Sequence, residues 1–179
     1  MTGTPEPRLI PPMTRLANFV CASTAASLLC VLGCDGGTAP TSMPVTVAGK
    51  TYACRLSIDD ATREKGMGGV ATVGPDEGML FAFPAAGARN FWMRGCIVGL
   101  DIAFIDPFGF VTAVHTMPAE PLQAEGESES TYLARLKPYP SGAPAQYALE
   151  VAPGELEKLG VKRGTKVEFD RAALKPHIR

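Results

Sequence analysis

The sequence has few of the residues on which most catalytic and metal sites depend. Two of its 179 residues are histidine and one is tryptophan, and its five cysteines form neither a C-x-x-C pair nor a Cys/His cluster. A zinc or redox centre therefore has little support. Phosphate-binding loops, dinucleotide fingerprints and a G-x-S-x-G elbow are also missing. The sequence predicts no metal, no cofactor and no nucleophile–base pair, and it leaves open whether the protein is an enzyme.

Charge of one sign is not in excess either. The chain has 17 Lys and Arg residues against 18 Asp and Glu residues, and no basic patch is interleaved with aromatics. We therefore expect no nucleic-acid partner. Four glutamates lie between residues 120 and 129 among Ser and Gly, a composition typical of a solvated loop.

The N-terminal part resembles an export signal with a lipoprotein cleavage site. Arg15 precedes an uncharged apolar run, residues 16–32, which ends at Gly33 and Cys34. We expect cleavage before Cys34 and lipidation of its thiol, so that the protein is membrane-anchored in the cell envelope and faces the periplasm or the exterior. The alternative is an uncleaved anchor helix over residues 16–33. The signal starts at Met1 or, in a more compact form, at Met13.

These boundaries predict four segments: a signal peptide (1–33), a flexible tether (34–46), a β domain (47–172) and a tail (173–179). Two cysteines, Cys54 and Cys96, remain in the β domain. Outside the cytoplasm they can form a disulfide. The alternative is that both are buried free thiols that pack as small apolar residues.

The pattern after residue 47 is that of a mainly β protein. Tyr52, Cys54, Leu56 and Ile58 alternate with polar residues, as in a half-buried strand. Further strands are expected over residues 77–83, 91–93, 97–106, 110–117, 147–151 and 166–169, with short helices near 59–65 and 153–160. Residues 106–109 (Asp-Pro-Phe-Gly) predict a tight turn. We expect a single antiparallel β-sandwich or barrel-like domain with one or two short helices.

Several motifs in register resemble one known family. They are residues 77–83 (EGMLFAF), 91–94 (FWMR), 100–106 (LDIAFID) and 145–151 (AQYALEV), followed by Gly154 and Gly164. The order and spacing are similar to those of the domain of unknown function 192 family over about residues 47–170. The resemblance implies a small, mostly β domain that is often exported, and it implies no established activity.

The chain departs from that family's pattern at two places. Residues 66–70 (GMGGV) lack the arginine that usually follows GLM and an aromatic residue, and Gly95 replaces the usual asparagine. If those two side chains contact a ligand in relatives, the ligand here differs or is absent.

Four residues are candidates for ligand binding: Trp92, Arg94, Asp101 and Glu150. Trp92 offers a face for stacking and Arg94 a hydrogen-bond donor, suited to a small-molecule or glycan ligand. Asp101 and Glu150 each interrupt an apolar strand, and a facing pair could act as acid and base. The alternative for each acid is pairing with a cation, Arg63 or Arg94, or with backbone donors.

Three hypotheses follow. The first is a lipid-anchored binding or accessory module that is not an enzyme. The second is a hydrolase, acting on glycans or other substrates, that needs the two carboxyls to face each other about 5–10 Å apart. The third is a structural envelope protein that binds a partner protein through a sheet edge.

Overall fold

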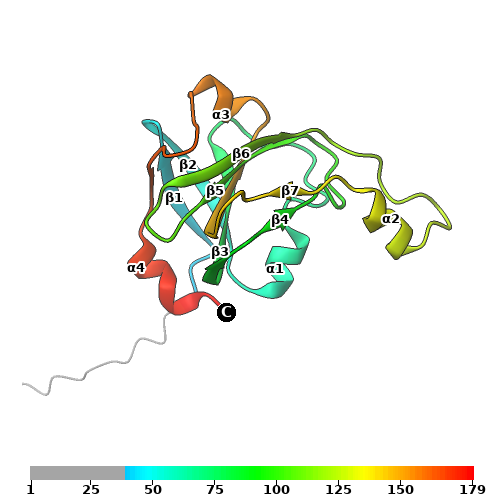
Figure 1. Cartoon of the computed structure of the whole chain (residues 1–179), viewed down its shortest axis with the longest axis horizontal. Helices are drawn as coiled ribbons and strands as arrows, with labels where there is room; N and C mark the ends of the chain where they lie inside the picture. The colour runs from blue at the N-terminus through cyan, green and yellow to red at the C-terminus, as the bar shows by residue number, and fades with distance from the viewer. Residues whose placement is uncertain (1–38) are drawn as a thin grey trace, which may run out of the picture. The chain divides into compact units, whose positions relative to one another are not determined.

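The computed structural model describes residues 39–179 (Figure 1). The predicted signal peptide and Cys34 lie outside the described residues. The strands are β1 (Ser42–Val47), β2 (Lys50–Ser57), β3 (Glu77–Gly87), β4 (Asn90–Phe91), β5 (Leu100–Ile105), β6 (Val111–Met117), β7 (Tyr139–Pro140), β8 (Ala145–Val151) and β9 (Val167–Glu168). The helices are α1 (Asp60–Lys65), α2 (Glu129–Arg135), α3 (Glu155–Lys158), α4 (Arg171–Leu174) and the 3₁₀ turn η1 (Lys175–His177). None of these helices is long and apolar enough to cross a bilayer.

Seven strands form one curled sheet in the order β6-β5-β8-β3-β2-β1-β9, and β4 and β7 form a separate pair. The two edges of the large sheet meet at one end, where Phe110 and Lys166 form a bridge and Val111 N donates to Thr165 O at 2.9 Å. The sheet is thus a half-barrel, with α3 and α4 at its ends (Figure 1).

Each face of the sheet carries its own apolar cluster. The inner cluster draws residues from all seven strands and from α3 and α4, which is possible only inside the curl; its members include Val45, Tyr52, Leu80, Leu149 and Leu156. The outer cluster lies on β3, β5, β6 and β8, and includes Phe81, Ile102 and Phe104. Met67, Met93 and Tyr139 cover that outer face from the segments around it. A strand between two apolar layers is buried on both sides, as β5 is at every residue.

The mainly β fold and most predicted elements are confirmed. The alternating strand appears as β2, and the polar segment after it forms α1, where the Asp59 carboxylate and Thr62 hydroxyl form a capping box. The predicted turn joins β5 to β6: Asp106 Oδ1 accepts hydrogen bonds from Phe108 N and Phe110 N, both at 2.8 Å.

Other predictions need correction. The sheet is mixed, because β2 and β3 are parallel, and the described residues contain four short α-helices where one or two were expected. The large sheet curls into a half-barrel and does not form the predicted sandwich. Residues 42–46, predicted as tether, form most of β1, which pairs with both β2 and β9. The predicted tail is docked, since Leu174 is fully buried and Arg179 N donates to Ile58 O at 2.9 Å.

Candidate functional site

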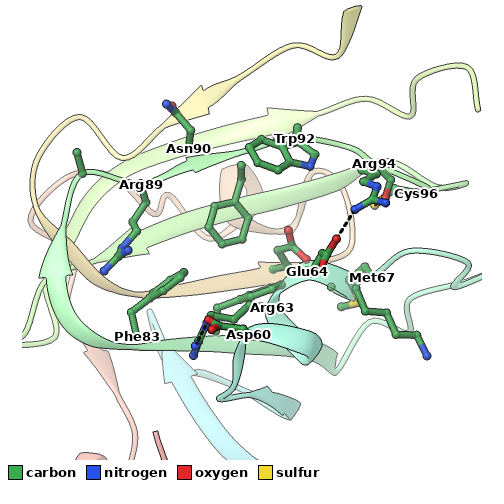
Figure 2. Close-up of a pocket in the computed structure, with 16 residues that line it drawn as sticks. Asp60, Arg63, Glu64, Met67, Phe83, Arg89, Asn90, Trp92, Arg94 and Cys96 are labelled. Carbon is green, nitrogen blue, oxygen red and sulfur yellow. Dashed lines mark hydrogen bonds and ion pairs between the residues drawn. The ribbon is translucent and has the colours of Figure 1, made fainter. Parts of the chain in front are cut away.

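A pocket of about 380 Å³ opens on the outer face of the sheet, between α1 and the segment that runs from β4 to Cys96 (Figure 2). Figure 2 shows Arg89 and Phe83 at one end and Trp92 and Arg94 at the other. The lining of the pocket includes Arg63, Glu64, Phe83, Arg89, Phe91, Trp92, Arg94, Cys96 and Glu150.

Aromatic rings form the fixed wall of this pocket. Phe91 of β4 packs edge-on against Phe81, with ring centroids 4.9 Å apart, and against Phe104 at 5.3 Å. Edge-to-face pairs of this kind add a stabilising energy to that of the buried area of the rings. Trp92, the next residue, remains 49% exposed although it lines the pocket. The pocket therefore presents an apolar face that a ligand can cover.

Arg63 reaches the pocket because α1 holds it there. The capping box fixes the first turn of this helix, and the Arg63 guanidinium donates to Ala82 O at 2.7 Å. It also pairs with Asp60 at 2.8 Å and donates to the backbone oxygen of Arg179. Arg63 is thus fixed by three groups and contributes a positioned positive charge.

Arg94 lies at the opposite end, between two helices. It pairs with Glu64 of α1 at 2.8 Å and with Glu129 of α2 at 2.5 Å. The carboxylates raise its pKa, with the hydrogen bond to Glu64 as the main cause. Tyr132 of α2 adds a second link, because its hydroxyl accepts from Gly95 N at 2.8 Å.

Gly95 explains one departure from the family pattern. Its φ is +66°, in the left-handed region that glycine and asparagine adopt most readily. The backbone conformation at this position accounts for either residue. The replacement of asparagine therefore carries no information about a ligand.

Glu150 is the most unusual group in the site. It lies on the outer face of β8, flanked by Met79 on β3 and Ile102 on β5, both buried. Its side chain is only 5% exposed, and Oε2 has no hydrogen-bond partner among the described residues. Burial raises the pKa of this carboxyl to about 8. The predicted pairing of Glu150 with Arg63 or Arg94 is therefore wrong: both arginines are engaged by other carboxylates.

Asp101 does not belong to the pocket. It is fully buried on the inner face of β5, where Oδ1 accepts from the Thr116 hydroxyl at 2.9 Å and Oδ2 from Leu156 N at 3.0 Å. The second bond satisfies a free amide in the first turn of α3. Because Asp101 is level with Val151 and Glu150 with Ile102, the two carboxyls point to opposite faces of the sheet. The facing acid pair that the hydrolase hypothesis requires is absent.

The two cysteines of the domain are likewise on opposite faces. Cys54 belongs to the inner cluster and Cys96 to the outer one, and both are free thiols. Burial raises the pKa of each to about 12. The structure has no disulfide between them, and Cys96 lies in the pocket beside Glu150.

Three of the four candidate residues, Trp92, Arg94 and Glu150, thus come together. Sequence reasoning missed Arg89, which follows the irregular end of β3 and has no periodic neighbour to suggest its role. Its guanidinium lies over the Phe83 ring, 4.0 Å from the centroid. The only available signal was the motif FAF at residues 81–83, which places an aromatic ring near the strand end.

Comparison with known proteins agrees with this architecture. The model of the DUF192 family, described as "Uncharacterized ACR", matches residues 43–169. A solved structure of a putative transcription regulator from Sinorhizobium meliloti 1021 is 29% identical, with a TM-score of 0.58, over 74% of this chain and 97% of its own. A protein of unknown function from Novosphingobium aromaticivorans DSM 12444 is also 29% identical, with a TM-score of 0.57, over 72% and 85%. No curated protein matches. The chain belongs to the DUF192 family.

Proposed function

We propose that this DUF192 protein is a lipid-anchored, extracytoplasmic binding module, without catalytic activity, whose outer-face pocket takes a small hydroxyl-rich ligand such as a sugar. Trp92 supplies a stacking face, and Arg94 and Glu150 supply polar contacts. The pocket is of the size that accepts a monosaccharide or disaccharide unit.

Glu150 carries the proposal. A buried polar group without a partner costs a protein stability, generally about 1–3 kcal/mol. Here the unpartnered carboxyl lines a pocket whose walls combine aromatic rings with charged side chains. A ligand hydroxyl or carbonyl that reaches the protonated carboxyl would satisfy it, so the cost has a functional explanation. Aromatic rings beside hydrogen-bonding groups suit the apolar face and hydroxyl edge of a sugar.

Asp101 and Glu150 cannot act as a catalytic pair, because Asp101 is hydrogen-bonded on the face of the sheet opposite to Glu150. The name of the S. meliloti relative suggests binding to nucleic acid. The nearly balanced charge of this chain, 17 cationic against 18 anionic residues, does not support that role here. A protein partner at a sheet edge remains the third hypothesis, without a specific contact that favours it.

The anchor rests on the sequence around Cys34. Seven residues separate Cys34 from the first residue of β1. At about 3.5 Å per extended residue, they span at most about 25 Å. A lipidated Cys34 would therefore hold the domain close to the bilayer, where its ligand would have to be present.

The binding role is tested by titrating the purified protein with a set of neutral and acidic monosaccharides in calorimetry. We expect at least one of them to bind, and Trp92→Ala to weaken that binding about tenfold or more. Phe108→Ala, which removes a 72% exposed ring outside the pocket lining, is the matched control and should bind like the wild type. A folded protein that binds none of the sugars would refute the proposed function.

The anchor is tested in cells with a fatty-acid label. The wild-type chain should incorporate the label and sediment with membranes. Cys34→Ser should do neither, whereas Cys54→Ser should behave like the wild type because Cys54 is buried in the inner cluster. Unlabelled, full-length protein in the cytosol of wild-type cells would contradict the anchor.

A further inference from the structure

Two arginines lie against one ring at the Phe83 end of the pocket. The Arg89 guanidinium carbon lies 4.0 Å and that of Arg63 5.3 Å from the Phe83 ring centroid. Both residues line the pocket, and Figure 2 shows their side chains on either side of Phe83. Such a pair brings two like charges together, and an anion beside them is attracted by both.

The two arginines differ in what balances them. Arg63 has Asp60 as an ionic partner. Arg89 donates to two backbone oxygens, those of Ala85 and Ala145, and pairs with no carboxylate among residues 39–179. Burial and the proximity of Arg63 both lower the pKa of Arg89, which means that its positive charge is poorly compensated where it stands.

The other charges of the pocket do not remove this excess. Arg94, at the far end, is paired with Glu64 and Glu129. Burial raises the pKa of Glu150 to about 8, so this carboxyl is mostly protonated at neutral pH and contributes little negative charge. The remaining lysine of the lining, Lys65, adds a positive charge. The lining of the pocket is therefore net positive, with the uncompensated guanidinium at the Phe83 end.

We infer that the ligand of this pocket is an acidic sugar, whose carboxylate binds Arg89 beside Arg63 while its ring lies toward Trp92 and its hydroxyls reach Glu150. The inference rests on the proposed function and specifies its ligand class. The planar guanidinium fork matches a carboxylate in two parallel hydrogen bonds. A carboxylate carries one negative charge, as the single unpaired guanidinium requires, whereas a phosphate monoester carries about 1.5 to 2.

The test uses pairs of sugars of which one member carries a carboxylate, directly or on a lactyl ether, and the other does not. Methyl β-glucuronide is compared with methyl β-glucoside, and N-acetylmuramic acid with N-acetylglucosamine, by calorimetry at neutral pH and low salt. Glucose 6-phosphate is the probe for a phosphate ligand. We expect at least one acid to bind roughly 10- to 100-fold more tightly than its neutral partner, because the neutral sugar lacks the carboxylate that forms the charge-assisted hydrogen bond.

Variants of Arg89 identify the group responsible. Arg89→Gln should remove the preference for the acid, because it weakens the binding of the acid far more than that of the neutral partner. Arg163→Gln, at an exposed arginine outside the pocket lining, is the matched control and should keep the preference. Should Arg89→Gln fail to fold, Arg89→Lys keeps the charge but loses the fork, and should lose most of the preference.

The outcomes separate the two proposals. Neutral sugars that bind as tightly as their acids, or a preference that survives in Arg89→Gln, would overturn this inference and leave the proposed function standing. Tighter binding of glucose 6-phosphate than of either acid would overturn the carboxylate assignment. Failure of every sugar to bind would overturn the proposed function together with the inference.

Discussion

Replacing Glu150 by glutamine should make the stability of this protein less sensitive to pH. The carboxyl has a pKa of about 8 in the folded protein because it is buried between apolar side chains, against 4.5 as the ordinary value. Between these two pH values the folded state holds a proton that the unfolded state has lost. The free energy of unfolding of the wild type therefore decreases as pH rises through this range.

The magnitude follows from the two pKa values. Each pH unit between 4.5 and about 8 removes about 1.4 kcal/mol, so the full loss is about 5 kcal/mol. Below pH 4.5 the group is protonated in both states and its contribution is constant. Above pH 8 it is ionised in both, and the whole cost of the buried charge remains. Glutamine keeps the shape and is never charged, so it lacks this slope.

The assay is urea unfolding of the wild type and Glu150→Gln at unit steps from pH 5 to pH 9. The difference between the two free energies of unfolding should move in favour of Glu150→Gln by several kcal/mol as pH rises. The other titratable groups of the pocket lining are common to both chains, so their own contributions largely cancel in the difference. Glu125→Gln, at an exposed glutamate, should show a flat difference. A flat difference for Glu150→Gln as well would refute the reasoning.

Three further predictions concern the domain's stability and its thiols. Asp101→Ala should lower the free energy of unfolding by about 2–3 kcal/mol, because it leaves the buried Leu156 N–H unpaired and removes the bond from the Thr116 hydroxyl. Asp101→Asn should cost clearly less, and equal losses in urea unfolding would contradict this role. Gly78→Ala should lower the free energy of unfolding by about 2–3 kcal/mol, because its methyl group would lie 2.8 Å from the carbonyl oxygen of Glu150 on the neighbouring strand. Gly87→Ala should be nearly as stable as the wild type, because the atom nearest to its methyl group is 3.6 Å away. A similar loss of stability in both variants would refute the steric argument. Cys54 and Cys96 should resist iodoacetamide at pH 8 in the native protein, because burial raises the pKa of both thiols to about 12. Both should react fully in urea without a reductant, because neither forms a disulfide. Peptide mass mapping checks this, and a need for reductant would reveal a disulfide.

Local sequence patterns predicted those parts of the fold that depend on neighbouring residues. The alternation at Tyr52 and Cys54 reflects a strand with one side in the inner core, and the turn at Asp106 depends on a carboxylate that bonds amides two and four residues ahead. Both are short-range effects. Proline content hid β1, because Pro40 and Pro44 suggested a tether although Met43, Val45 and Val47 alternate with less buried residues. The segment is a strand because β2 and β9 lie on either side of it.

The candidate site shows the same division. Sequence alone identified Trp92, Arg94 and Glu150, each an isolated polar or aromatic group in an apolar context, and the structure brings them to one pocket. It could not decide between Asp101 and Glu150, because both interrupt an apolar strand in the same way. The register of β5 against β8 turns one inward, where backbone and hydroxyl donors bind it, and leaves the other unpaired on the outer face. Only tertiary pairing fixes that register, because a shift of one residue moves a side chain to the opposite face of a sheet.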